Sequence, residues 1–492
     1  MQLSKSDYLT YLKHPAWLWL KKNRKEILPA PSGALQALFD AGHAYEAYAE
    51  QLFEGGVRLG FDNYREYQSL PERTKDALAN GANTIFQGRF ENGQTTCIVD
   101  VLTRVVDDLF DLYEIKSGTS VKAEHIPDLA FQASVLEGAG LKLRNIGVVH
   151  ANREYTRAGD IDLRAISKIE DVTNQVAERK PQTLEEIEQA LGVATQAQMP
   201  DPSPRYLAGG DMAEWMEIYA ALNGEPDKYS IYNLASVKPD QIGAFEDAGI
   251  ANIASIPDDA KLTKGQARQV SVTKSNDRLI DAGEIGRFLA GLTYPLYFLD
   301  YETFAHVVPP FDRLRPYQQV PFQYSLHIIN EPGAAIEHRE YLHSSTSNPA
   351  AELVERLKQD IGEQGSVIVW YAPFETGRNR ELAEMLEEHA DYLNALNDRV
   401  VDLMVPFKSG WYVDKAFMGS SSIKKVLPVL VPELTYEGLA INNGELAQRA
   451  WMDMYLEGKP AVDEAKLLDD LRKYCELDTL AMVRIFEVLQ GV

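Results

Sequence analysis

Two acidic motifs in the C-terminal part of the chain carry residues that could do chemistry. They are YFLDYET, with Asp300 and Glu302, and YCELD, with Tyr474 and Asp478. The first motif is typical of a short buried strand, in which side chains at i and i+2 point to the same face. The second has the apolar spacing of a helix, where residues four apart share one face. Each motif therefore predicts a surface that presents its polar groups together.

Carboxylates gathered in a fold interior repel one another and lose hydration unless cations neutralise them. Hard oxygen ligands of this kind suit Mg²⁺ or Mn²⁺. The two motifs therefore indicate metal-assisted phosphoryl chemistry.

Two further acids could complete such a site. The segment SVIVWYAPFETGRNRELAEML reads as a strand, a turn and a helix, and it places Glu375 just beyond the end of the strand. The segment RVVDLMVPFK reads as another short strand, and it carries Asp402. The spacing alone leaves both open as the third acid.

The order of these motifs resembles the DEDD exonucleases of the RNase H-like fold, in the subgroup with a tyrosine in its last motif. The resemblance covers most of residues 295–490. It implies that Asp300, Glu302 and Asp478 bind two metal ions and that Tyr474 orients the attacking water. The family's third acid is an aspartate after Phe, whereas this chain has YAPFE. The match after Phe favours Glu375 as the metal ligand, with Asp402 as the alternative.

A second group of candidate residues lies near the N-terminus. Asp100 is expected to end one strand, and Glu114 and Lys116 share a face of the next strand in YEIKSG. An acid pair that holds a divalent ion, with a lysine beside the developing charge, is a workable hydrolytic site. The alternative is a solvated strand edge.

With GH upstream and QASVLEGAG downstream, this group resembles the RecB-like branch of the PD-(D/E)xK nucleases over residues 1–165. The resemblance implies that His43 adds a metal ligand to Asp100 and Glu114. It also implies that Gln132 and Lys116 act at the catalytic centre. Many relatives hold an iron–sulfur cluster through four cysteines, but this chain has only two. We therefore expect no iron–sulfur cluster.

The chain is expected to be an α/β protein of three parts. Residues 1–165 are predicted to form the PD-(D/E)xK nuclease-like domain. Residues 166–290 are predicted to form a helical linker region, for which a helix-hairpin-helix-like module is the alternative to a plain spacer. Residues 291–492 are predicted to form the RNase H-like domain of the DEDD exonuclease type.

Composition narrows the classes of protein to consider. The chain has 492 residues, 45% of them hydrophobic and 25% charged, as in soluble globular proteins. We find no signal-peptide pattern and no apolar run long enough to span a membrane. Two cysteines favour a reducing compartment, so a cytoplasmic protein without a membrane partner is expected. The net charge of −24 argues against a surface that coats nucleic acid broadly.

The sequence as a whole predicts a divalent-metal-dependent nuclease with two centres. The C-terminal centre is expected to be a 3′-to-5′ exonuclease on single strands, and the N-terminal centre a second nuclease. DNA is favoured over RNA as the nucleic-acid partner, and nothing indicates a protein partner. One alternative is a non-catalytic nucleic-acid-processing scaffold with one or both sites degenerate. Another is activity on nucleotides or small phosphodiesters.

Overall fold

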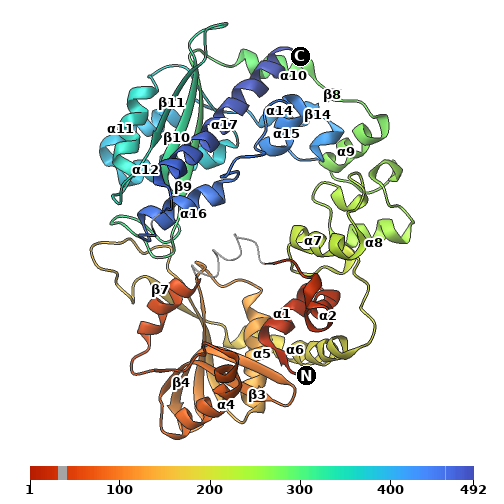
Figure 1. Cartoon of the computed structure of the whole chain (residues 1–492), viewed down its shortest axis with the longest axis vertical. Helices are drawn as coiled ribbons and strands as arrows, with labels where there is room; N and C mark the ends of the chain where they lie inside the picture. The colour runs from red at the N-terminus through yellow and green to blue at the C-terminus, as the bar shows by residue number, and fades with distance from the viewer. Residues whose placement is uncertain (31–41, 460) are drawn as a thin grey trace. The chain divides into compact units, whose positions relative to one another are not determined.

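The chain folds as a mixed α/β protein made of two compact units (Figure 1). The computed structural model describes residues 1–30, 42–459 and 461–492. Unit 1 comprises 1–226, 239–243 and 307–317, and unit 2 comprises 227–238, 244–306 and 318–492. The first division falls inside the segment 166–290, most of whose regular structure is helical, and residues 307–317 of the predicted third part belong to unit 1.

Unit 1 is built on a mixed sheet with the strand order β2-β3-β4-β5-β6-β7, and β1 pairs with β4. Strands β3, β4 and β5 are antiparallel neighbours, whereas β5 and β6 run parallel and are connected through helix α5. Parallel neighbours require such a crossover. The strands are β1 (Leu3–Ser4), β2 (Val57–Arg58), β3 (Thr84–Asn92), β4 (Thr95–Val106), β5 (Leu109–Lys116), β6 (Lys142–Ala151) and β7 (Ser167–Asp171).

Helix α5 fills the core of unit 1. Its residues Leu129, Ala130 and Phe131 are fully buried in one cluster with Leu112 and Val148 of the sheet. The α helices are α1 (Lys5–Lys13), α2 (Pro15–Asn23), residues 42–49, α4 (Tyr64–Ala79), α5 (His125–Gly138), α6 (Thr173–Thr195) and α7 (Met212–Asn223). The 3₁₀ helices are η1 (Lys25–Ile27), η2 (Glu50–Leu52) and η3 (Pro204–Tyr206), and α8 (Pro239–Asp247) lies where the division between the units falls.

Unit 2 is built on a sheet of order β11-β10-β9-β12-β13. Strands β11, β10 and β9 are antiparallel, and β12 and β13 run parallel to β9. The strands are β9 (Leu296–Phe304), β10 (Val320–Ile329), β11 (Glu337–Leu342), β12 (Ser366–Val369) and β13 (Val400–Asp402), and a separate pair joins β8 (Leu279–Ile280) to β14 (Tyr412–Val413).

Alternate residues of β9 face different helices. Phe298 packs against Phe486 of helix α17 with ring centroids 5.6 Å apart. Tyr301 points the other way and donates a hydrogen bond of 3.0 Å to Asn379 of helix α12. Because side chains alternate along a strand, Asp300 and Glu302 share the face of Phe298. In Figure 1, α17 crosses the sheet over β9 and β10.

Helix α17 runs for 27 residues, Glu464–Gln490. Asp463 caps its N-terminus, and buried apolar residues recur along the face that meets the sheet. The other helices of unit 2 are η4 (Ile231–Asn233), η5 (Ile253–Ser255), α9 (Lys264–Ser275), α10 (Ala282–Ala290), α11 (Ala350–Asp360), α12 (Ala372–Met385), η6 (Glu387–His389), α13 (Ala390–Asn397), α14 (Val405–Lys408), η7 (Lys415–Phe417), α15 (Ile423–Leu430) and α16 (Gly444–Tyr455).

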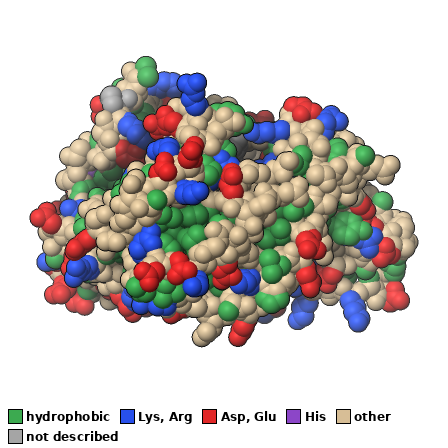
Figure 2. Space-filling model, turned by 90° about the horizontal axis from the view of Figure 1, so that it is seen from below, with side chains coloured by type: hydrophobic (Ala, Val, Ile, Leu, Met, Phe, Trp, Pro, Cys, Tyr) green, Lys and Arg blue, Asp and Glu red, His purple; other side chains and the backbone are tan. Residues whose placement is uncertain are grey.

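Charged side chains of both signs are interspersed on the face that Figure 2 shows, with hydrophobic side chains between them. Within the described residues, no helix combines the length and the apolar character needed to cross a membrane.

Candidate functional site

The acids of unit 2 meet where strand β9 lies under helix α17. Asp300 and Glu302 come from β9 and Cys475 comes from α17, and the possible ligand atoms of these three residues all lie within 4.8 Å of one another. The Cys475 thiol lies 3.9 Å from a carboxylate oxygen of Asp300. Two distant segments thus bring carboxylates and a thiol into one group.

Helix α17 adds Tyr474 and Asp478, both less than a tenth exposed. They stand four residues apart, so they share a side of the helix. The Tyr436 hydroxyl donates a 2.5 Å hydrogen bond to Asp478 Oδ1. The ammonium of Lys424 lies 3.5 Å from the Tyr474 hydroxyl and 5.4 Å from the ring centroids of Tyr436 and Tyr474. A lysine and two tyrosines therefore border the acids.

Crowding of the acids favours their protonated forms. Burial, reinforced by Asp478, Glu302 and Glu375, raises the pKa of Asp300 well above its ordinary value. Burial and Asp478 likewise raise the pKa of Glu302, although Lys424 opposes this. Burial also raises the pKa of Asp478 to about 6, against the effects of Tyr436 and Lys424. When these three acids are ionised, the positive charge of Lys424 therefore does not balance their negative charge.

Glu375 and Asp402 occupy different environments. Glu375 lies in the first turn of α12, is 2% exposed, and has a buried Oε2 atom without a hydrogen-bond partner. Burial raises its pKa to about 8. Asp402 ends β13 and accepts hydrogen bonds of 3.0–3.1 Å from the backbone N–H groups of Tyr371, Ala372 and Met404. Asp402 thus caps α12, and Glu375 is the acid with an unsatisfied oxygen.

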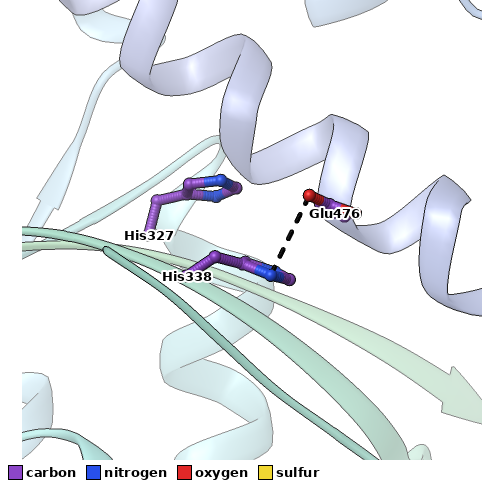
Figure 3. A group of neighbouring side chains, drawn as sticks. All are labelled: His327, His338 and Glu476. Carbon is purple, nitrogen blue, oxygen red and sulfur yellow. Dashed lines mark ion pairs between the residues drawn. The ribbon is translucent and has the colours of Figure 1, made fainter. Parts of the chain in front are cut away.

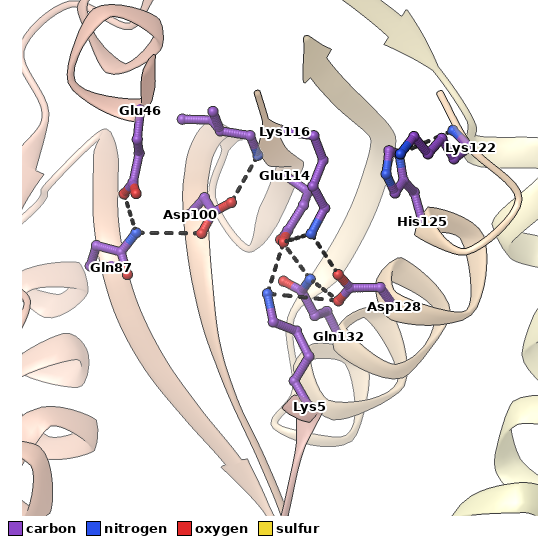
Figure 4. Close-up of polar contacts among 11 residues, drawn as sticks. Lys5, Glu46, Gln87, Asp100, Glu114, Lys116, Lys122, His125, Asp128 and Gln132 are labelled. Carbon is purple, nitrogen blue, oxygen red and sulfur yellow. Dashed lines mark hydrogen bonds and ion pairs between the residues drawn. The ribbon is translucent and has the colours of Figure 1, made fainter. Parts of the chain in front are cut away.

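A second polar cluster occupies unit 1 (Figure 4). Lys116 Nζ lies 2.7 Å from Glu114 Oε1 and 2.9 Å from Asp128 Oδ2. Lys5, from the start of α1, lies 2.8 Å from Glu114 Oε1 and 3.7 Å from Asp128 Oδ1. Gln132 donates to Glu114 Oε2 at 2.7 Å and to Asp128 Oδ1 at 2.9 Å. Two carboxylates, two ammonium groups and an amide are thus locked together.

Asp100 stands beside this cluster. One of its oxygens accepts a 2.8 Å hydrogen bond from the Ile115 backbone N–H, and the other lies 3.4 Å from Gln87 Nε2, which also donates to Glu46. The strand does not end at Asp100 as expected, because residues 101–106 of β4 continue to pair with β5.

His43 lies exposed on the helical residues 42–49. Of the hydrogen bonds and ion pairs that the described residues form, none joins His43 to Asp100 or Glu114. The nearest link from this helix to the cluster is made instead by Glu46, through Gln87.

Asp100 and Glu114 of unit 1 have pKa values that are shifted in opposite directions. Burial and Glu114 raise the pKa of Asp100 to about 7, although Lys5 and Lys116 oppose this. Burial also disfavours the Glu114 carboxylate, but Lys116 and Lys5 outweigh it and hold the pKa of Glu114 below its ordinary value. The two lysines therefore compensate Glu114 more fully than Asp100.

Sequence reasoning missed several members of the two clusters. Asp128 lies four residues before Gln132, so its place on the same helix face was readable from the spacing. Lys5 and Tyr436 carry no such signal, since Lys5 is more than a hundred residues from Glu114 and Tyr436 stands in a turn-rich segment. Cys475 lies inside the YCELD motif, but it was not expected to touch the acids.

Comparison with known proteins gives a partial match. A family model described as a domain of unknown function (DUF2779) matches residues 297–422. This range includes Asp300, Glu302, Glu375 and Asp402, and it ends before Tyr474.

Three relatives from mycoplasmas and a ureaplasma match parts of the chain. The "Uncharacterized protein MG366 homolog" of Mycoplasma pneumoniae is 26% identical over 206 residues, which cover 38% of this chain and 31% of that protein. "Uncharacterized protein MG366" of Mycoplasma genitalium is 24% identical over 215 residues, covering 40% and 32%. "Uncharacterized protein UU173" of Ureaplasma parvum is 23% identical over 312 residues, covering 57% and 43%. The chain spans less than half the length of these relatives.

Proposed function

We propose that unit 2 is a divalent-metal-dependent nuclease that hydrolyses nucleic-acid phosphodiesters, acting as a 3′-to-5′ exonuclease on single strands. The observation that carries the proposal is the group of under-compensated acids Asp300, Glu302 and Asp478 between β9 and α17. Acids held in this state are costly to a fold and are typical of functional sites.

The residues present fit Mg²⁺ or Mn²⁺. The donor set is dominated by carboxylate oxygens, which these hard cations prefer. Glu375 contributes a buried oxygen without a partner, as expected of a ligand atom. Asp300, Glu302, Asp478 and Glu375 would hold the metal, whereas the oxygens of Asp402 are engaged by backbone N–H groups.

Bound divalent ions would lower the pKa of a water molecule and offset charge on the leaving oxygen. Tyr474 is placed beside the acids with a hydroxyl that can orient a water by hydrogen bonding. Lys424 is exposed at the same place and can meet a phosphate group as a point charge. Tyr474 and Lys424 would therefore position the water molecule and the phosphate group, which the acids alone cannot do.

The resemblance to DEDD exonucleases of the RNase H-like fold supports this assignment, as does the arrangement of β9 between antiparallel β10 and parallel β12. Acids buried to this degree would accept an unpaired strand end more readily than an intact duplex. The nucleic-acid substrate, the polarity and the preference for DNA are part of the proposal.

The decisive experiment is cleavage of an end-labelled single-stranded oligonucleotide by the purified full chain with Mg²⁺, Mn²⁺ or EDTA. We expect metal-dependent release of mononucleotides that falls by at least about 100-fold in Asp300→Asn. Asp469→Asn is the matched control, because Asp469 is an exposed aspartate of α17 paired with Lys473. Equal cleavage by Asp300→Asn and the parent chain would refute the assignment.

Tyr474→Phe tests the role of the tyrosine separately. Loss of the hydroxyl should lower kcat by about 100-fold while Mn²⁺ binding is retained, since the phenyl ring preserves the packing. Replacing the oligonucleotide by a mononucleotide ester distinguishes a polymer nuclease from an enzyme of small phosphodiesters.

For unit 1 we propose a RecB-like PD-(D/E)xK fold with Asp100, Glu114, Lys116 and Gln132 at its centre. A specific observation favours a silent, scaffold-type centre there: Lys5 and Lys116 already neutralise Glu114 and Asp128. The test uses the Asp300→Asn background, in which any metal-dependent DNA cleavage that remains should vanish on adding Asp100→Asn. If none remains before that change, the silent centre is supported.

A further inference from the structure

A histidine pair lies on strands β10 and β11, next to helix α17 (Figure 3). His327 of β10 and His338 of β11 are cross-strand partners whose ring centroids are 4.6 Å apart. His338 Nδ1 lies 3.9 Å from Glu476 Oε1 of α17, and possible ligand atoms of the three residues all lie within 4.8 Å of one another. The proposed nuclease reaction uses none of these three residues, although Glu476 is the glutamate of the YCELD motif.

Hydrogen bonds from two hydroxyl groups orient both rings. Thr479 Oγ1 lies 2.8 Å from His327 Nδ1, 2.7 Å from Ser325 Oγ and 3.1 Å from the Glu476 carbonyl oxygen. Ser325 Oγ lies 3.0 Å from His338 Nε2. The carbonyl can only accept, so the Thr479 hydroxyl donates to it and accepts from both Ser325 and His327. Ser325 has then used its proton and accepts from His338.

This proton arrangement satisfies all four contacts and fixes both tautomers. His327 carries its proton on Nδ1, and His338 carries its proton on Nε2. The lone pairs of His327 Nε2 and His338 Nδ1 remain, and His338 Nδ1 lies 3.9 Å from Glu476 Oε1. Histidines that bind metals are oriented in this manner, by a hydrogen bond from the ring nitrogen that does not bind.

We propose that His327, His338 and Glu476 form a second metal site, of the kind that binds Zn²⁺ through two imidazoles and one carboxylate. Imidazole nitrogen suits zinc and related transition metals, whereas the acids of the neighbouring group suit Mg²⁺ or Mn²⁺. The two sites would therefore select different ions, although α17 contributes to both.

The geometry requires a small closure. Ligands about 2.0–2.1 Å from a tetrahedral zinc ion lie about 3.3 Å apart, closer than the 3.9 Å between His338 and Glu476. These two side chains are 26% and 45% exposed, so they can adjust, while His327 is 4% exposed and fixed. The exposure also leaves a fourth position open to water or a ligand.

A metal ion bound by these three residues would link helix α17 to the edge strand β11.

Burial together with His338 and Arg484 lowers the pKa of His327 to about 4, so its ring is neutral near pH 7. A neutral ring is the form that binds metal.

The test measures metal binding by the full chain, expressed without a histidine tag and stripped with EDTA. We expect one equivalent of Zn²⁺ to remain after dialysis, Co²⁺ to give a visible d–d absorption, and Zn²⁺ to raise Tm. His338→Gln and Glu476→Gln should each weaken Zn²⁺ binding by more than about 100-fold. His338 is partly exposed, so its replacement leaves the core intact.

Three control variants keep the outcome interpretable. His150→Gln removes a histidine that faces a glutamate, Glu170, at 3.5 Å in unit 1, and Glu487→Gln removes an exposed acid of α17. Asp300→Asn alters the acidic group, which has a thiol nearby. All three should keep the zinc equivalent and the Co²⁺ spectrum. A parent chain that binds no Zn²⁺, or a His338→Gln chain that binds it equally well, would overturn the proposal.

Discussion

Glu375 and Asp402 show at the level of single residues how a structural acid differs from a ligand. Glu375 lies beyond the end of β12 and Asp402 is the last residue of its parallel neighbour β13, and sequence spacing alone could not separate them. The carboxylate of Asp402 is saturated by three backbone N–H groups, whereas Glu375 keeps an unpartnered buried oxygen. Their replacements should therefore have different effects.

Glu375→Gln should weaken Mn²⁺ binding and lower cleavage by at least about 100-fold, while the Tm of the metal-free protein stays equal or rises. The physical reason is that the amide has the same shape and is neutral at every pH, whereas the buried carboxyl must hold a proton to be neutral. Asp402→Asn should instead lower the stability by about 1 kcal/mol through the weakened cap of α12, with a smaller loss of activity. Calorimetric Mn²⁺ titration and thermal melts of both variants check this. A larger loss of Mn²⁺ binding in Asp402→Asn would reverse the two roles.

The raised pKa values predict how stability depends on pH when metal is absent. Asp478 rises from 3.8 to about 6 and Glu375 from 4.5 to about 8. The folded state thus binds more protons than the unfolded state between about pH 4 and pH 8, and the free energy of unfolding falls as pH rises through this window. In EDTA, Tm should decrease from pH 5 to pH 8, and Mn²⁺ should reverse the loss.

Glu375→Gln is the internal control for this pH dependence. Its Tm should fall less steeply above pH 6, because the group that titrates near pH 8 has been removed. A parent Tm that rises with pH in EDTA would contradict the raised pKa values.

Sequence spacing predicted the individual acids better than their surroundings. Asp300 and Glu302 share a strand face, and Tyr474 and Asp478 share a helix side, because both relations follow from local periodicity. Tyr436 donates a hydrogen bond to Asp478, and its position beside that acid depends on the path of a long connecting segment. Such tertiary neighbours leave no periodic signal in one sequence.

At the scale of elements, the side chain of Lys5 joins helix α1 to strand β5. Lys5 begins α1 behind the capping residue Ser4, and its ammonium reaches Glu114 of β5 and Asp128 of α5. Burial disfavours the ammonium, yet Asp128, Glu114 and Asp100 raise the pKa of Lys5 well above its ordinary value. Electrostatic contacts therefore add to the packing of Tyr8 on Phe131 in holding the N-terminal helix to the core of unit 1.

Lys5→Met should destabilise the protein by about 2 kcal/mol, because it keeps the apolar stem and removes one of the two cations that balance buried acids. Lys180→Met is the matched control, since Lys180 pairs with Glu137 between helices at the surface, and it should cost less than about 0.5 kcal/mol. Urea unfolding of both variants measures the difference. Equal costs would mean that Lys5 is solvated and does not stabilise the acids.

Element boundaries were harder to predict than element types. The strand and helix types around YEIKSG and YCELD follow from periodicity, but Asp100 lies within β4 because the pairing with β5 continues to Val106. Glu375 lies in the first turn of α12, whose start is fixed by a cap from β13. When the capping carboxylate belongs to a distant strand, the start of the helix cannot be read from the local sequence.

At the scale of the whole molecule, the net charge of −24 opposes the approach of a polyanion. Binding of a fluorescent single-stranded oligonucleotide should therefore be weak in EDTA and should tighten by at least about 10-fold with Ca²⁺, which offsets the acids without supporting hydrolysis. Fluorescence anisotropy measures both states. In the Asp300→Asn variant, Ca²⁺ should increase the oligonucleotide affinity by a smaller factor. Equal affinity with and without the ion would show that metal is not part of nucleic-acid recognition.

The two cysteines of the chain are distributed one to each compact unit. Cys97 lies in β4 and Cys475 in α17, and both thiols are free and buried. A thiol-modifying reagent can reach either sulfur only when the surrounding structure opens. The modification rate of Cys97 then reports the opening free energy of unit 1, and that of Cys475 reports the separation of α17 from its sheet. Each unit thus contains one buried thiol whose modification rate reports its own opening, and both rates can be measured in the unmutated chain.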